Sequence, residues 1–256
     1  MRLTKEEQKL VPKSYEVVGD ILIFANFPKE LKKKEKEIAK EFLDKLKQVK
    51  VITKKTGNFS GKYRLQKLKI MAGERRKKTI HKENGVKIKV NPEKAYFSSK
   101  SSTERLRISK LIKKEERVLV MFSGVAPYPL TIAKHSNAKE VYGIESNPDA
   151  HELGLQNVSL NKFNNVILYK GDVKKILPKI KKKFDRIIMP HPSDSESYFK
   201  LTLSKLKPKG KIHMYVFEKE ENFKDLKNKY KKYKPKLVKA GSPAPGKFRV
   251  CLDLKT

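Results

Sequence analysis

The 256 residues include 62 lysines and arginines against 28 aspartates and glutamates, a formal net charge of +34 that is spread along the chain. This excess favours a polyanionic partner, most simply nucleic acid, over the alternative of a merely soluble lysine-rich surface. A single cysteine, Cys251, excludes a disulfide framework within the chain and is expected to be a small core residue. We expect a cytoplasmic protein without membrane contact, because no apolar run reaches the roughly 18–20 residues that cross a bilayer and the N-terminus lacks the apolar region of a signal peptide.

The first part of the chain has a mixed pattern in which strands dominate. Two short strands are predicted around a turn at Gly19 and Asp20, and apolar residues at helical spacing predict a helix over 30–48. Strands are predicted over 49–55 and 63–73, and alternation around Asn84-Gly85 predicts a hairpin over 78–91. We therefore predict a small α+β domain over residues 1–95.

The second part, residues 96–256, alternates strictly between strand and helix. After a helix at 102–112, strands are predicted at 117–122, 140–145, 165–169, 184–189, 210–217, 235–239 and 247–254. Helices are predicted between them at 127–135, 148–160, after Asp172, at 194–206 and at 220–231. Such alternation is typical of a mostly parallel sheet covered on both faces. The fold prediction is an α/β, Rossmann-like seven-stranded sheet that ends in an antiparallel hairpin, preceded by the smaller α+β domain.

Ligands of such sheets bind at the carboxyl ends of the strands. The first strand ends in Phe122, Ser123 and Gly124, where glycine allows close approach and the next helix offers free amides. A turn with one glycine is a weak motif, and the alternative is an ordinary strand-to-helix corner.

Two acids follow the next two strands. Glu145 is placed to bind the ribose hydroxyls of an adenosine, and Asp172 to accept from the adenine amino group. The alternatives are helix capping, by Ser146 and Asn147 beside Glu145 and by Asp172 itself. The joint spacing of both acids after Gly124 favours an adenosine-containing cofactor.

Three further features allow either a functional or a structural interpretation. The fourth strand ends in "MPHP", residues 189–192, where two prolines fix a rigid turn. Its backbone carbonyls could accept from a base, or the prolines could simply separate the strand from the next helix. Ser102 or Thr103 could cap a helix whose first turn contains Glu104 and Arg105, a position where an acid is favourable in any case. Arg64 and Lys67, on a strand of the first part, look like surface charges.

Taken together in this order, "GKYRLQKLKIMAGERRKKTIHKENG", "YFSSKSSTERLRI", "MFSGVAPYPLTIAK", "VYGIESNP", "GDV", "IIMPHP" and "APGKFRVCLDL" resemble the archaeal and eukaryotic tRNA (guanine-37-N1)-methyltransferases. The resemblance extends from Leu10 to Lys255. It implies a class I methyltransferase domain that uses S-adenosylmethionine, and a preceding domain that helps to hold the tRNA anticodon stem-loop.

The resemblance also implies roles for single residues. Glu104 would accept the proton of guanine N1, Arg64 would stabilise charge on O6, and Pro192 would belong to the turn, with Pro190 and His191, that frames the target base. The remaining implied residues bind the cofactor: Arg105, Phe122, Ser123, Gly124, Glu145, Ser146, Asp172, Val173 and Pro190.

Four positions depart from the family pattern: Val120 stands where the family usually has Asp, Ala126 for Gly, Pro190 for Asn and Ser99 for Pro. An additional N-terminal domain of many members would precede this chain. We expect no metal and a monomer.

Three alternatives remain open. One is the wyosine-pathway transfer of an aminocarboxypropyl group from the same cofactor to a modified G37, although "MPHP" favours methyl transfer. Another is methylation of a wyosine precursor. From a different class, the chain could be a tRNA-binding protein whose enzyme site has lapsed.

Overall fold

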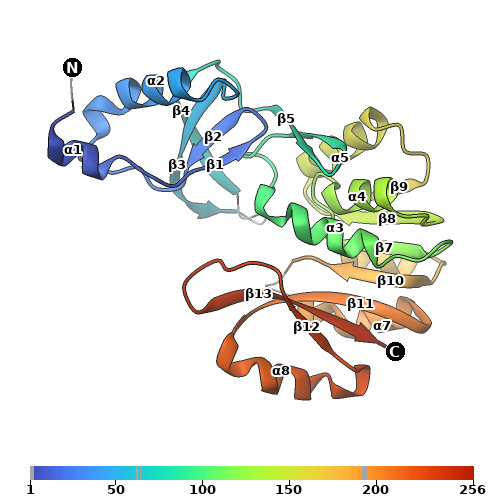
Figure 1. The fold of residues 1–256 in the computed structure, drawn as a ribbon. Helices are drawn as coiled ribbons and strands as arrows, with labels where there is room; N and C mark the ends of the chain where they lie inside the picture. The colour runs from blue at the N-terminus through green and yellow to red at the C-terminus, as the bar shows by residue number, and fades with distance from the viewer. Residues whose placement is uncertain (1–2, 62, 64, 192–194) are drawn as a thin grey trace. The chain divides into compact units, whose positions relative to one another are not determined.

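A computed structural model describes residues 3–61, 63, 65–191 and 195–256 of the chain (Figure 1). Contacts divide it into two compact units, Met1–Glu83 with Lys87–Ser99, and Asn84–Val86 with Lys100–Thr256. Among the described residues, no helix is both long and apolar enough to cross a membrane.

The first unit contains a four-stranded sheet in the order β1-β2-β3-β4 within its described residues, and α2 packs on β3 and β4. The apolar side chains between them include Phe24, Ala39 and Ile52. A short helix at the N-terminus, α1, was not predicted, because it buries none of its residues and a capping box of Thr4 and Glu7 begins it instead. The elements are α1 (Lys5–Leu10), β1 (Glu16–Val18), β2 (Ile21–Phe24), α2 (Glu35–Lys45), β3 (Val51–Ser60), β4 (Leu65–Gly73), β5 (Thr79–Glu83) and β6 (Val86–Val90).

The second unit alternates strand and helix as predicted. It begins with α3 (Ser102–Lys110) and continues through β7 (Arg117–Met121), α4 (Pro127–His135), β8 (Glu140–Glu145), α5 (Pro148–Leu160), β9 (Val166–Lys170), α6 (Val173–Ile176), β10 (Phe184–Met189), α7 (Phe199–Lys205), β11 (Leu206–Lys219), α8 (Phe223–Lys229), β12 (Lys236–Lys239) and β13 (Lys247–Lys255).

The described strands of this unit form a seven-stranded sheet in the order β12-β13-β11-β10-β7-β8-β9, which confirms the predicted fold (Figure 1). β13 runs antiparallel to both β11 and β12. The strand order reverses between β7 and β10, so the turns that follow these two strands flank the switch point where ligands of such sheets bind.

Two details of the prediction were wrong. β11 begins at Leu206, because Pro208 and Gly210 are absorbed in an irregularity with left-handed Lys209 and do not break the strand. The helix predicted over 220–231 consists of three short turns, Glu220–Asn222, Phe223–Lys229 and Lys231–Tyr233.

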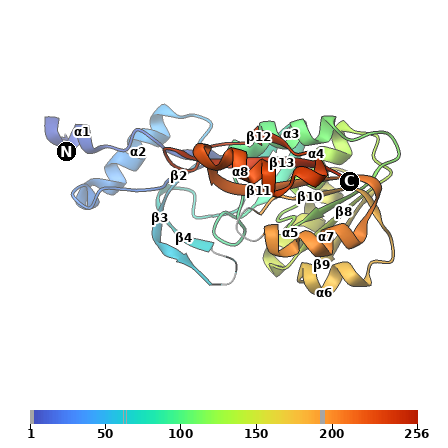
Figure 2. The ribbon, with the colours of Figure 1, turned by 90° about the horizontal axis from the view of Figure 1, so that it is seen from below.

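Helices cover both faces of the sheet: Figure 2 shows α3 and α4 on one side of the strands and α6 and α7 on the other. Period-two alternation sends Leu119 and Met121 into the cluster that includes α6 to α8, and Val118 and Val120 into the cluster with α3 and α4. Cys251 is fully buried in the second cluster, which confirms its prediction as a core residue.

Candidate active site

The turn after β7 has an unusual backbone. Phe122, Gly124 and Ala126 have positive φ values of 54°, 56° and 68°. For the two residues with a Cβ this conformation costs roughly 1–2 kcal/mol each, so their surroundings must enforce it. The Ser123 amide donates to the Ile144 carbonyl at 2.9 Å, and the Ala126 amide donates to the Ser123 carbonyl at 2.9 Å.

Helix α5, which follows β8, packs against this turn. Gly154 lets the helix approach, since a Cβ there would lie 3.0 Å from Leu168 and 3.6 Å from Ala126. Asn157, fully buried, donates from its amide to the Val125 carbonyl at 3.0 Å. Sequence reasoning missed Asn157, although an amide at an inward position of a helix is a signal for such a contact.

Glu145 ends β8 and faces the same turn. Its carboxylate accepts from the Gly124 amide and from the Asn147 amide, each at 2.7 Å. Burial raises the pKa of Glu145, against the lowering effect of these backbone donors. Asn147, and not Glu145, caps α5 by accepting from Asp149 and Ala150. The structure therefore brings Gly124 and Glu145 together, and a carboxylate beside a glycine turn suits the diol of a ribose.

Asp172 is the N-cap of α6, where its side chain accepts from the Lys174 amide at 2.8 Å. This contact is the structural alternative given for Asp172, and a role toward adenine stays a prediction. Val173 beside it is buried. Val120 stands where the family usually has an acid. It is fully buried in the cluster with Ile188 and offers no polar group to the turn.

Glu104 lies in the first half of α3 and is 7% exposed. Arg107 donates to both of its oxygens, at 2.7 and 2.8 Å, and the Tyr215 hydroxyl donates to Oε1. The predicted cap of α3 was wrong: the N-cap is Ser101 and it makes no side-chain capping bond, since the preceding turn Ser99–Ser101 leads directly into the helix. Arg105 is also buried.

The turn after β10 lies near Tyr215, the partner of Glu104, and near the turn after β7. The Pro190 carbonyl accepts from Arg249 at 3.2 Å, and the Arg249 guanidinium lies 4.1 Å from the centre of the Tyr215 ring. The His191 ring lies 5.5 Å from the ring of Phe122. The turns after β7 and β10 thus meet at the switch point.

Arg64 and Pro192 lie outside the described residues, and their roles stay predictions. Sequence reasoning also missed Arg107, His213, Tyr215, Arg249 and Asp253. The sequence did contain a signal for a polar cluster. Residues an even number of positions apart on a strand share a face, as do His213 with Tyr215 and Arg249 with Asp253.

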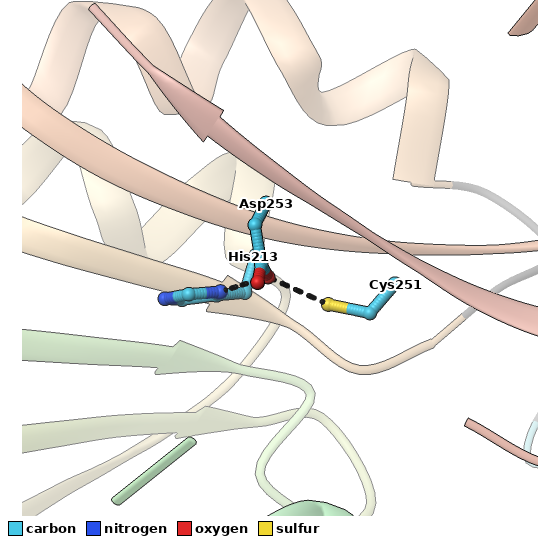
Figure 3. A group of neighbouring side chains, drawn as sticks. All are labelled: His213, Cys251 and Asp253. Atoms are coloured by element: carbon cyan, nitrogen blue, oxygen red, sulfur yellow. Dashed lines mark hydrogen bonds and ion pairs between the residues drawn. The ribbon is translucent and has the colours of Figure 1, made fainter. Parts of the chain in front are cut away.

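One group of described side chains has the spacing of a metal site. His213, Cys251 and Asp253 each offer a ligand atom, and these atoms lie within 4.8 Å of one another (Figure 3). Hydrogen bonds already engage them: the His213 ring and the Cys251 thiol both contact Asp253, the thiol at 3.2 Å. Burial raises the pKa of Cys251, which agrees with a protonated thiol that donates to Asp253 in this arrangement.

A seven-stranded sheet with an antiparallel β13 beside β11, a glycine turn after β7 and an acid at the end of β8 defines a class I methyltransferase. Residues 79–239 match the family described as the TRM5/TYW2 methyltransferase domain, and residues 1–76 match the TYW2 N-terminal domain. The chain belongs to the TRM5/TYW2 family.

Three curated relatives show the range of activities within the TRM5/TYW2 family. The chain is 33% identical to "tRNA (guanine(37)-N(1))-methyltransferase Trm5b" of Pyrococcus abyssi, over 100% of this chain and 78% of the relative. It is 34% identical to "tRNA 4-demethylwyosine(37)-methyltransferase Taw21" of Saccharolobus solfataricus, over 98% and 96%. It is 32% identical to "tRNA(Phe) (4-demethylwyosine(37)-C(7)) aminocarboxypropyltransferase" of Methanocaldococcus jannaschii, over 94% and 97%.

Solved structures of related proteins have the same fold. The Trm5b structure from Pyrococcus abyssi has a TM-score of 0.84 at 31% identity, over 100% of this chain and 78% of that one. A complex of aTrm5 with tRNALeu has a TM-score of 0.83 at 32% identity, over 98% and 74%. Methanocaldococcus jannaschii TYW2 in complex with AdoMet has a TM-score of 0.69 at 27% identity, over 94% and 98%.

Proposed function

We propose that the chain transfers a methyl group from S-adenosylmethionine to N1 of guanosine 37 in the anticodon loop of tRNA. The observation that carries this proposal is a chain of contacts that connects Glu104, the proposed base, to the turn after β10, which is proposed to frame the target base. Tyr215 donates to Glu104, the proposed base, and carries Arg249 on its ring face, while Arg249 donates to Pro190 in the proposed target-base turn.

The residues around the glycine turn suit the cofactor. The Glu145 carboxylate can accept from ribose hydroxyls in addition to its backbone donors, and left-handed Gly124 leaves room for a ligand against the backbone. The other proposed cofactor contacts are Arg105, Phe122, Ser123, Ser146, Asp172, Val173 and Pro190. When bound, S-adenosylmethionine supplies an electrophilic methyl group on a sulfonium.

The protein's own task is to handle the proton and the charge on guanine. A carboxylate has about four acceptor sites, and described residues donate three hydrogen bonds to Glu104, to which the N1 proton of guanine would add a fourth. Arg64 would stabilise negative charge on O6, and Pro192 would frame the base. G37 has to leave the loop stack to reach these groups. The net charge of +34 supports attraction of the tRNA backbone.

A second candidate is methylation of 4-demethylwyosine at position 37. It is favoured by the relative Taw21, which matches this chain over nearly the whole length of both proteins, and by the TYW2 N-terminal domain at residues 1–76.

The test uses S-adenosylmethionine labelled either in the methyl group or in the carboxyl group. The acceptors are a G37 transcript, an A37 control and tRNA that carries 4-demethylwyosine. We expect methyl label on G37 alone. Carboxyl label in the product would indicate aminocarboxypropyl transfer, methyl label only on 4-demethylwyosine the second candidate, and tRNA binding without any transfer a lapsed site. Glu104→Gln should lower turnover and leave tRNA affinity unchanged.

A further inference from the structure

A continuous chain of polar side chains crosses the interior of the second unit, on the face of the sheet that α3 and α4 cover. Carboxylates, guanidinium groups, an imidazole and hydroxyls alternate along it, so that donors meet acceptors at each step. We call this chain the polar relay. In order, its members are Glu116, Arg186, His213, Asp253, Arg107, Glu104, Tyr215 and Tyr128.

The first steps fix the state of His213. Arg186, 1% exposed, donates to both oxygens of Glu116 and approaches Nε2 of His213 at 2.7 Å. A guanidinium can only donate, so Nε2 must accept and Nδ1 must hold the proton that is donated to Asp253. His213 is therefore neutral in one tautomer, and burial lowers its pKa in agreement with this state.

The next steps connect Asp253 to the proposed base. Burial alone would raise the pKa of Asp253, but His213 and Arg107 outweigh burial and hold it below its usual range. The ionised Asp253 accepts from Arg107 at 2.8 Å, and the other edge of the same guanidinium grips Glu104. Asp253 thus orients Arg107, and Arg107 orients Glu104.

The relay also holds the helix that carries Glu104. Arg186 donates to the Leu111 carbonyl, the C-cap of α3, at 2.6 Å. His213 pairs with Asp253, and Tyr215 with Cys251, in the register of β11 and β13. The antiparallel pairing of these two strands therefore determines where the carboxylate of Glu104 lies.

We propose that His213, Asp253 and Arg107 are positioning residues, which hold the Glu104 carboxylate in one orientation to accept the proton of the target base. This inference rests on the proposed function, because it assigns the relay a role only if Glu104 removes a proton. None of the three residues needs to touch the substrate. The contact between His213 and Asp253 is a step of this relay, and the Cys251 thiol donates to the same Asp253 carboxylate from outside it (Figure 3).

The test compares Asp253→Asn and Arg107→Lys with matched variants whose ion pairs lie outside the relay, Asp185→Asn and Arg117→Lys, at the amino ends of the central strands β10 and β7. At neutral pH both relay variants should slow single-turnover methyl transfer by about 10–100-fold, since small misplacements of reacting groups have effects of this size. Affinities for tRNA and S-adenosylmethionine should stay within about twofold, and the matched variants should keep the parent rate within about twofold.

The pH dependence separates positioning from a general structural role. The rate deficit of the relay variants should shrink as the pH rises into the range where guanine N1 loses its proton without a base. A deficit that is constant with pH, a parallel loss of binding, or a parent-like rate would overturn the proposal. One zinc ion per chain whose removal abolishes activity would also overturn it.

A second measurement does not depend on turnover. ¹⁵N NMR of the parent should show His213 as a neutral imidazole protonated at Nδ1, and Asp253→Asn should disturb that signal. An imidazolium or the opposite tautomer would contradict the relay. If the parent transferred no methyl group but showed the expected His213 signal, the proposed function would fail while the hydrogen-bonded arrangement stood.

Discussion

The two halves of the candidate site are built from different parts of the chain. At the turn after β7, backbone groups provide the contacts. The Ser123 amide donates to the Ile144 carbonyl, and the Gly124 amide donates to the Glu145 carboxylate at the end of the next strand. The polar relay instead uses side chains drawn from Glu104 to Asp253. A backbone-built turn tolerates changes of side chain that preserve its shape, whereas loss of one relay group leaves a buried partner unsatisfied.

The largest effect should follow from Arg186→Met in the relay. The change leaves Glu116 without its guanidinium and His213 Nε2 without a donor, and breaking a buried ion pair in this way costs about 3–5 kcal/mol. Urea unfolding would measure the loss. Arg117→Met, which removes the more exposed pair with Glu140, should cost roughly 1 kcal/mol or less. Equal losses in the two variants would show that burial of the relay adds nothing.

This contrast also explains what could be predicted from the sequence. Gly124 and Glu145 follow consecutive strands, so their meeting at one edge of the sheet follows from the alternating pattern alone. The relay depends on the register of β11 against β13 and on the position of β13 between β11 and β12. The apolar pattern of a single strand predicts neither its register nor its neighbours in the sheet. Glu104 was predicted as a functional residue only through the family resemblance, and its partners Arg107 and Tyr215, whose contacts depend on this packing, were not predicted.

An intermediate effect should follow from Asn157→Leu beneath the turn. The variant leaves the buried Val125 carbonyl without its side-chain donor, which costs about 1–3 kcal/mol, and the loosened turn should bind S-adenosylmethionine more weakly. Calorimetric titration and urea unfolding would measure both. The control is Gln156→Leu on the exposed side of α5, where the amide donates to Glu152 one turn away and the change should stay within about 0.5 kcal/mol. Unchanged affinity in Asn157→Leu would mean that the turn keeps its shape without α5.

The pH dependence of stability should report on His213. Because its pKa is lowered in the folded protein, the unfolded chain binds the proton more tightly, and stability declines as the pH falls below about 6.5. Asp253, whose folded pKa is lowered by its partners, adds a further decline below about 3.9. The slope from one proton is at most about 1.4 kcal/mol per pH unit. Unfolding of His213→Asn between these limits should show a shallower first decline, of which the part from His151, whose pKa burial also lowers, remains. A slope equal to that of the parent would assign the whole decline to His151 and other groups.

The smallest effect is expected at the strained turn itself. Ala126→Gly relieves a left-handed conformation worth roughly 1–2 kcal/mol, but it removes a buried methyl group worth about 0.8 kcal/mol and makes the unfolded chain more flexible. These contributions nearly offset, so the variant should be neutral or more stable by up to about 1 kcal/mol. Ala133→Gly lies inside helix α4, of which Ala126 is the N-cap, and has no strain to relieve, so it should instead lose about 1 kcal/mol. If both variants lost stability equally in urea unfolding, the left-handed turn would not be strained, and the glycine usual in the family at this position would need another explanation.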